Sequence, residues 1–155
     1  MPPHMIETLE ALKDHIGQEI GVTDWLAVSQ ERIQQFADAT GDQQWIHVDR
    51  ERAKRESPFR DTIAHGFLTL SLLPQFVPQV LKIKDEVRMG INYGLNRVRF
   101  VSPVRADSKV RARFTLQSLK DVPPKAMEAV FVATVESEGS DKPCCVVEWV
   151  VRYYL

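Results

Sequence analysis

The sequence has 155 residues, of which 44% are hydrophobic and 26% are charged, and its formal net charge is −1. This size and composition are typical of one globular domain with a substantial core, so we expect a single domain over residues 1–155. A net charge near zero gives no bulk electrostatic reason to bind nucleic acid or a membrane surface. No apolar run is long enough to span a membrane, and Met1–His4 lacks the charged and apolar regions of a signal peptide. We therefore expect a cytoplasmic protein.

The first third of the chain predicts two helices separated by an extended segment. A weak helical stripe runs over Met5–His15, and Ile20–Val28 is poor in helix formers and reads as a strand. Ser29 is suited to cap a helix over Gln30–Thr40, which ends at Gly41. This helix leads directly into the first stretch with chemical potential.

That stretch is Ala39–Asp49, which places Asp42 and His47 five positions apart in a loop-like segment. An Asp and a His within proton-transfer reach suit general acid-base catalysis. Their spacing alone is also compatible with an Asp that shapes a turn and a His with a structural role. The pair becomes a candidate site through its wider context.

The segment after His47 predicts scaffolding rather than chemistry. Asp49 is placed to cap a short charged helix, Arg50–Glu56. Ser57 and Pro58 then stop this helix, because the residue before a proline disfavours the helical conformation. Phe59–Thr62 follows as a loop.

The most apolar stretch, Ile63–Leu81, predicts a helix that is buried nearly all round. Pro74 and Pro78 each remove a backbone donor, so we expect a kink or a tightened last turn. Gly66 near its start would let a ligand approach backbone N–H groups. For His65 we favour a role in orienting the loop or bonding its backbone over a direct role.

The second half of the chain changes to the two-residue period of strands. Val110–Gln117 alternates apolar and polar side chains, which is typical of a strand with one covered face. We predict three further strands and two turns. The strands are Arg88–Val101, broken at Gly94, Ala126–Glu138 and Cys144–Leu155, and the turns are Val122–Lys125 and Gly139–Pro143. Short turns make the strands antiparallel, so we predict an α+β fold in which the sheet wraps the apolar helix.

Cys144 and Cys145 are the only cysteines. Adjacent residues cannot form an ordinary structural disulfide, which agrees with a reducing compartment. Nor do they have the spacing of metal ligands, so we expect no metal site.

Four motifs in order now resemble the MaoC-like dehydratases, and within them (R)-specific enoyl-CoA hydratases and nodulation protein N-like members. They are Gly41-Asp42-x-x-x-x-His47-x-Asp49, Ile63-Ala64-His65-Gly66-Phe67-Leu68, Asn92-Tyr93-Gly94-Leu95 and Arg97-Val98-Arg99-Phe100-x-x-Pro103-Val104. The resemblance implies a hot-dog fold, in which an antiparallel sheet wraps a long central helix and two subunits pair with active sites near their interface. One departure is Gln44-Trp45, where many members have Asn-Pro.

The resemblance assigns Asp42 and His47 to a dyad that hydrates trans-2-enoyl-CoA to (R)-3-hydroxyacyl-CoA. We expect Asp42 to be the base and His47 to position the water and relay the other proton, with exchangeable roles because the pair is coupled. The Gly66 N–H would stabilise charge on the thioester oxygen, and Ser71 matches a family serine near the site. Coenzyme A is part of the substrate, and we expect no cofactor.

Two other functions would use the same fold: an acyl-CoA thioesterase and a non-catalytic acyl-CoA-binding protein. These residues are compatible with any acyl length and with either coenzyme A or acyl carrier protein as the carrier. They are also compatible with several lipid pathways. Seven basic residues against Asp107 alone could attract coenzyme A phosphates or form a solvated strand face: Arg88, Arg97, Arg99, Arg105, Lys109, Arg111 and Arg113.

The strand Cys144–Leu155 is apolar on both faces, which predicts a homodimer.

Overall fold

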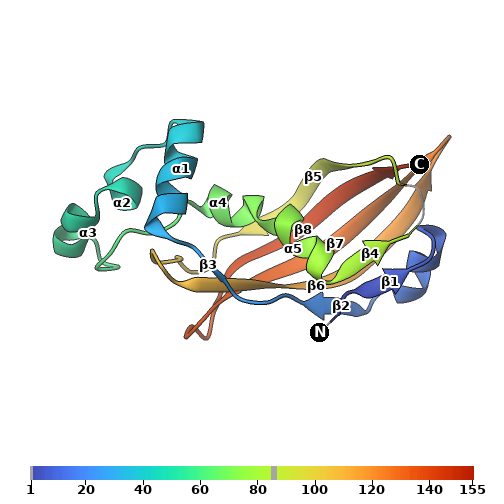
Figure 1. Cartoon of the computed structure of the whole chain (residues 1–155), viewed down its shortest axis with the longest axis horizontal. Coiled ribbons are helices and arrows are strands. Elements are labelled where there is room, and N and C mark those ends of the chain that lie inside the picture. Colours follow the sequence, from blue (N-terminus) through green and yellow to red (C-terminus); the bar gives the residue numbers. More distant parts are fainter. Residues whose placement is uncertain (1, 85–86) are drawn as a thin grey trace.

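The computed structural model describes residues 2–84 and 87–155 of the predicted domain. Its main element is a six-stranded antiparallel sheet in the order β2-β6-β7-β8-β5, with β3 also pairing with β6 (Figure 1). The strands of this sheet are β2 (Glu19–Val22), β3 (Leu26–Ala27), β5 (Met89–Arg99), β6 (Lys109–Val122), β7 (Ala126–Ser137) and β8 (Pro143–Tyr154). A separate parallel pair joins β1 (His4–Ile6) to β4 (Leu81–Ile83).

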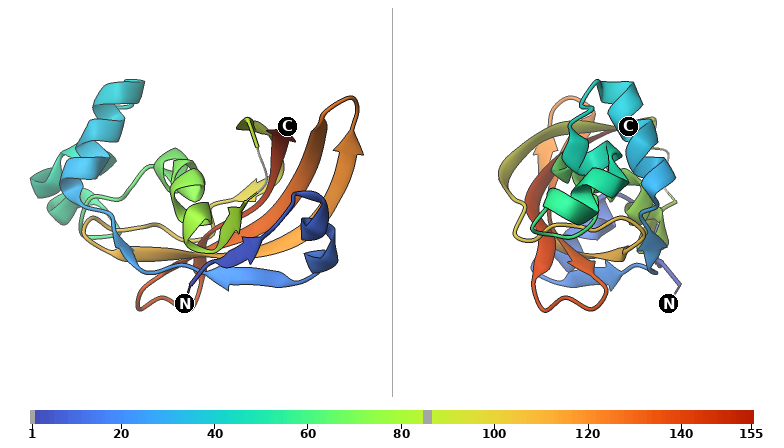
Figure 2. Two further views of the ribbon diagram at one scale, coloured as in Figure 1. Left: turned by 45° about the vertical axis from the view of Figure 1, so that its right-hand side comes forward. Right: turned by 90° about the vertical axis from the view of Figure 1, so that its left-hand side faces the viewer.

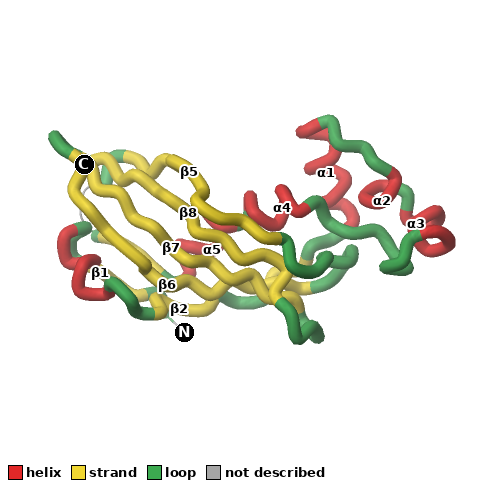
Figure 3. Tube along the Cα trace, turned by 180° about the vertical axis from the view of Figure 1, so that it is seen from behind, coloured by secondary structure: helices red, strands yellow, loops and turns green. Residues whose placement is uncertain are grey.

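The helical segments are η1 (Glu10–His15), α1 (Gln30–Thr40), α2 (Trp45–Val48), α3 (Arg50–Glu56), α4 (Gly66–Ser71), α5 (Leu73–Phe76) and η2 (Val77–Gln79). Apart from η1, they form two groups: α1, α2 and α3, and α4, α5 and η2. In Figure 2, α5 lies on the concave side of the curved sheet. Seen from behind in Figure 3, α1, α2 and α3 lie beyond one end of the sheet. The start of α4 faces this outlying helical group, so the chain joins the two groups at one place (Figure 1).

The core fills the space between the sheet and the segment that contains α4 and α5. Phe76 and Leu73 of α5 are almost fully buried, and so are Phe114 and Phe131 of two neighbouring strands. The rings of Phe114 and Phe131 meet edge to face with centroids 6.4 Å apart, a favourable geometry for aromatic pairs. Burial of this apolar surface stabilises the sheet against the helices.

The predicted α+β fold and its four long strands are confirmed. Along β6 the apolar residues Val110, Ala112, Phe114 and Leu116 are buried, as their alternation predicts. The two predicted turns connect β6 to β7 and β7 to β8, and both pairs are antiparallel. Both cysteines are buried and carry free thiols, and burial raises the pKa of Cys144 to about 12.

The helix predicted over Ile63–Leu81 is wrong in its extent and burial. The chain becomes helical at Gly66, is interrupted at Leu72 and continues as α5 and η2 before it turns into β4. Pro74 and Pro78 both occupy first-turn positions of the new segments, where a missing N–H leaves no bond unmade. Phe67 on α4 is 69% exposed, so the helix is not buried all round in this chain.

Two predictions near the N-terminus are confirmed in part. The segment Met5–His15 contains part of β1 and a 3-10 helix in place of an α-helix. The predicted strand Ile20–Val28 is divided into β2 and β3. The interruption occurs at Thr23, whose Oγ1 accepts a hydrogen bond from the Ala112 N–H in place of regular pairing.

Candidate active site

Helix α1 ends at Thr40, and Asp42 lies in the short link between α1 and α2. Ser29 caps the helix as predicted, because its side chain accepts a hydrogen bond from the Arg32 N–H. At the other end Gly41 has φ of 83°, a left-handed conformation, and its N–H donates to the Ala37 carbonyl. This turn places Asp42 just outside the helix, with its side chain 53% exposed.

His47 lies in the short helix α2, whereas the sequence predicts a loop at this point. Its side chain is buried, and Nδ1 is 2.7 Å from the Ile63 carbonyl oxygen. A carbonyl can only accept, so Nδ1 carries the hydrogen and the neutral ring has its lone pair on Nε2. The Gln30 side chain donates to the His47 carbonyl at 2.8 Å, which holds the main chain as well.

The lone pair of His47 lies close to the Asp42 carboxylate. The distance from His47 Nε2 to Asp42 Oδ2 is 3.9 Å, which is too long for a direct hydrogen bond. Burial lowers the pKa of His47, and the neighbouring His65 lowers it further, against the opposing effects of the Ile63 carbonyl and Asp42. The site therefore presents a neutral imidazole acceptor next to a carboxylate.

His65 is a third member of this cluster, which we define as Asp42, His47 and His65. Its ring stacks on the His47 ring, with centroids 3.8 Å apart and an interplanar angle of 23°. His65 Nε2 lies 3.0 Å from the Asp42 carbonyl oxygen and donates to it. The sequence motif drew attention to His65, but the contact with Asp42 joins residues that are 23 positions apart and is not visible in the sequence.

The cluster could be considered as a metal site, since its donor atoms lie within 4.8 Å of one another. Donors on a tetrahedral zinc ion, at about 2.0 Å from it, lie about 3.3 Å apart. Asp42 Oδ2 is 3.9 Å from His47 Nε2 and 4.0 Å from His65 Nε2. Moreover, His65 Nε2 donates a hydrogen bond to a carbonyl, so it has no lone pair for a metal ion. The two stacked rings also do not converge on one point. The arrangement suits hydrogen bonding to a small molecule better than chelation.

Gly66 and Ser71 occupy different places. Gly66 is the first residue of α4 and borders a cavity of about 470 Å³, which Phe100 also lines. A Cβ atom at position 66 would lie 3.0 Å from the Phe100 ring, so a larger residue here would have to displace this ring. Ser71 is exposed, donates to the Phe67 carbonyl at 2.6 Å and lines a second cavity. The structure thus brings Gly66 next to the cluster through His65, but not Ser71.

A polar network with no recognisable signal in the sequence supports α2. The Thr62 hydroxyl donates to the Gln30 side chain, which in turn donates to the His47 carbonyl. Arg50 in the next helix forms two hydrogen bonds with Asp61, at 3.0 and 3.1 Å. Such bidentate pairs fix geometry as well as charge. They anchor the loop that carries Ile63 to the helix that follows His47.

Part of the predicted basic face is already paired within the chain. Arg111 and Arg113 both bond to Glu136, at 2.7 and 3.2 Å. The Arg111 guanidinium also lies 4.4 Å from the centroid of the Trp25 ring. These two arginines are therefore held by partners within the sheet.

Comparison with known proteins agrees with this fold and site. The sequence profile of the MaoC like domain matches residues 11–138. The chain is 49% identical over 147 residues to 3-hydroxyacyl-thioester dehydratase Z of Mycobacterium tuberculosis, covering 95% of this chain and 96% of the relative. It is 46% identical over 144 residues to nodulation protein N of Rhizobium leguminosarum bv. viciae, covering 92% and 89%. The chain belongs to the MaoC-like dehydratase family.

A solved structure supports the same conclusion about the fold. The (R)-hydratase from A. caviae involved in PHA biosynthesis superposes with a TM-score of 0.70 at 23% identity, covering 88% of this chain and 94% of that one. The fold is the hot-dog fold that the resemblance implied. Within residues 2–84 and 87–155, none of the helices has the length and apolar character needed to cross a membrane.

Proposed function

We propose that this protein catalyses the (R)-specific hydration of trans-2-enoyl-CoA, and the reverse dehydration, with Asp42 and His47 as its catalytic dyad. The observation that carries the proposal is the spacing of 3.9 Å between two acceptors, the Asp42 carboxylate and the neutral His47 Nε2. One water can donate a hydrogen to each, which orients its oxygen lone pair toward C3 of a bound enoyl group. The family assignment and the name of the 49% identical relative support this chemistry.

The reaction balances without a cofactor, because coenzyme A is part of the substrate. The water oxygen bonds to C3 while the dyad, with Asp42 as the base, takes one of its protons. The electron pair of the double bond moves toward the thioester, and the dyad returns the proton to C2. Because Asp42 and His47 share one water, the two act as a coupled unit and their roles are exchangeable.

The thioester oxygen gains negative charge in this step, and we assign the Gly66 N–H to stabilise it. Gly66 begins α4, so its amide is among those that a helix leaves without an internal acceptor. It directly follows His65, whose ring touches both members of the dyad. Removal of one such donor typically costs about 3 kcal/mol in transition-state stabilisation.

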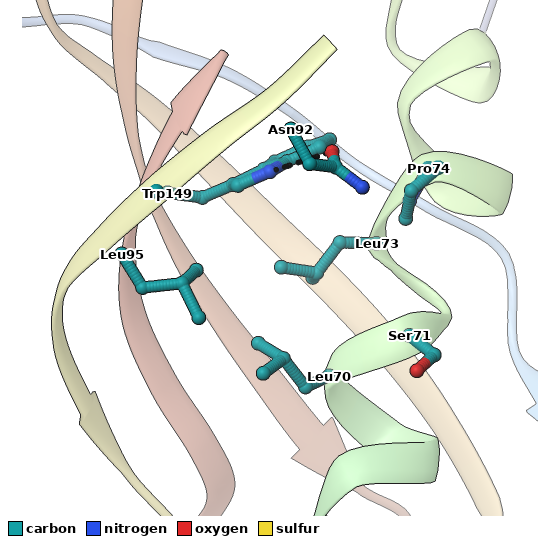
Figure 4. Close-up of a pocket in the computed structure, with 8 residues that line it drawn as sticks. Leu70, Ser71, Leu73, Pro74, Asn92, Leu95 and Trp149 are labelled. Carbon is teal, nitrogen blue, oxygen red and sulfur yellow. Dashed lines mark hydrogen bonds between the residues drawn. The ribbon is translucent and has the colours of Figure 1, made fainter. Parts of the chain in front are cut away.

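We place the acyl chain in the second cavity, which has a volume of about 380 Å³ and lies between α4, α5 and β5 (Figure 4). Its wall is mainly apolar and is made by Leu70, Leu73, Pro74, Leu95 and Trp149, with Ser71, Asn92 and Gly94. The Trp149 indole donates to the Asn92 side chain at 3.1 Å, which fixes both groups. Since Leu70 is four residues beyond Gly66, about 6 Å along a helix, this position is consistent with an acyl chain leaving a thioester held at Gly66.

We also propose a homodimer, but on a different strand from the one that the sequence indicated. β8 lies inside the sheet between β7 and β5, so most of its apolar residues are already covered. β5 forms one of the two edges of the sheet, and it exposes Met89, Ile91 and Tyr93 by 43–55%. A long apolar edge strand is a template for pairing with a second chain.

A single assay on the purified protein separates the proposed function from its alternatives. With crotonyl-CoA as the probe, loss of the conjugated enoyl-thioester absorbance reports hydration, and we expect this signal with an (R)-3-hydroxybutyryl product. Release of free thiol would report a thioesterase. Saturable binding without either signal would report a non-catalytic binding protein, and either of these outcomes, or an S product, would refute the proposal.

A further inference from the structure

The arrangement around His65 is more specific than packing requires. Its side chain is 3% exposed, and its ring contacts the two members of the dyad in different ways. One edge donates from Nε2 to the Asp42 main chain, and one face stacks on His47. The Phe36 ring, 4.9 Å away, closes the site from α1.

The main chain of His65 adds a third connection. Its carbonyl accepts hydrogen bonds from the Leu68 and Thr69 amides, which form the first turn of α4. The next residue is Gly66, the proposed donor to the thioester oxygen. His65 is therefore the one residue of the cluster whose backbone starts α4 while its side chain holds the dyad.

We propose that His65 is a positioning residue, which fixes Asp42 and the plane of the His47 ring relative to the Gly66 amide. This inference rests on the proposed function, because it concerns the geometry of the same dyad. The reaction needs a water near Asp42 and His47 and a thioester oxygen at Gly66 at the same time. A misplacement of about 1 Å between such groups can lower a rate about 10²-fold.

The hydrogen-bond pattern also divides the two histidines by role. The remaining nitrogen of His65, Nδ1, is buried and has no acceptor or donor within the described residues 2–84 and 87–155. A hydrogen on it would be a buried donor without a partner, so the packing suits the neutral ring with hydrogen only on Nε2. His65 Nε2 also lies near the Asp42 carboxylate, at 4.0 Å, but it carries the hydrogen that it donates to the Asp42 carbonyl. His47 Nε2, at 3.9 Å, has a lone pair and can take a proton. His65 thus positions the dyad, whereas His47 can take part with Asp42 in the proton transfer.

Two variants separate the two side-chain contacts. His65→Phe keeps an aromatic ring against His47 but removes the donor to Asp42, and His65→Gln keeps an amide donor but removes the stacked ring. We expect each to lower kcat about 10- to 100-fold with little change in KM, because substrate binding is not altered. His15→Gln, in η1 far from the helical group, is the matched control and should retain the wild-type rate.

A second measurement does not depend on activity. The titration and tautomer of His47, followed by NMR of ring-labelled histidine, report its surroundings directly. His47 faces Asp42 and His65, and burial is the main cause of its lowered pKa, so loss of the stacked His65 ring in His65→Gln should raise the pKa of His47 toward its ordinary value. Circular dichroism and thermal melting establish that each variant is folded.

The outcomes are distinct. If the wild type hydrates crotonyl-CoA and Asp42→Asn does not, while both His65 variants keep the wild-type kcat and the His47 titration, then His65 only fills space and the inference is wrong. A lower melting temperature with unchanged kcat and titration leads to the same conclusion. If the wild type does not hydrate the substrate, the proposed function fails, and an unchanged His47 titration and tautomer would then overturn the role of His65 separately.

Discussion

The chemistry of the site depends on which nitrogen of His47 carries its hydrogen. The Ile63 carbonyl accepts a hydrogen bond from Nδ1, so Nε2 is the acceptor nitrogen opposite Asp42. This assignment comes from a main-chain contact 16 residues away. A His at the same position without that carbonyl could present either nitrogen.

Substitution of either dyad residue tests its role. We expect Asp42→Asn and His47→Gln each to lower kcat by about two to four orders of magnitude, the range that general acid-base catalysis contributes. The double variant should be little worse than the poorer single one, because both groups act on one water in one transition state. The control variants Asp14→Asn and His15→Gln, both in η1, should have the wild-type rate in the same crotonyl-CoA assay.

The acid limb of the pH profile follows from the burial of His47. Its pKa is lowered from the ordinary value of 6.5, chiefly by burial, so the neutral form persists below that pH in the folded protein. Activity should fall as pH drops through the lowered pKa, and a midpoint at or above 6.5 would contradict this.

The unfolded chain binds the proton at higher pH, so this group's contribution to stability should be present above pH 6.5 and be lost as pH falls through the folded pKa. The free energy of unfolding, measured with denaturant at several pH values, should therefore depend less on pH in His47→Gln than in the wild type.

At the scale of elements, the turn after α1 determines where Asp42 lies. Gly41 and Gly17 both have positive φ, 83° and 85°, and an added Cβ atom would meet nothing within 4 Å at either position. Alanine at each should destabilise the protein by about 1–2 kcal/mol through backbone conformation alone. Only Gly41→Ala should also lower kcat, because Asp42 follows it directly. Urea unfolding and the hydration assay measure the two effects, and equal activity of the two variants would contradict the expected role of this turn.

The sequence predicted elements well where local patterns agree with the tertiary structure. The alternation in Val110–Gln117 matches the face that the core covers, the cap at Ser29 is a local contact, and both predictions are confirmed. The length of the helix over Ile63–Leu81 was overestimated, because apolar content does not reveal that α4 ends and a new helix, α5, begins just before Pro74. The contacts that complete the cluster, from His65 to Asp42 and from His47 to Ile63, join distant parts of the chain and have no local signal. The type and order of the site motifs were visible, but their hydrogen bonding was not.

For the whole molecule, the edge of the sheet should determine assembly. We expect light scattering at micromolar concentration to give about twice the mass of the 17.7 kDa chain. Ile91→Arg should shift the protein toward a monomer, because a charge on an apolar edge strand opposes pairing. Ile16→Arg is a matched control, since Ile16 is 44% exposed and Ile91 is 43% exposed, but Ile16 follows η1 away from this edge. A fully active wild-type monomer would contradict the proposed dimer.

The two register shifts in β5, between Asn92 and Gly94 and between Leu95 and Arg97, have a consequence for how the sequence can change. Asn92 and Leu95 both line the proposed acyl cavity although they are three residues apart, a spacing that a regular strand would place on opposite faces. Each shift adds one residue, so the two together restore the original phase beyond Arg97. Loss of a single residue here would move the side chains at one end of the strand to the opposite face of the sheet. Loss of both extra residues would keep the side chains at its two ends on their present faces. Insertions and deletions in this strand should therefore be tolerated in pairs during divergence of the protein.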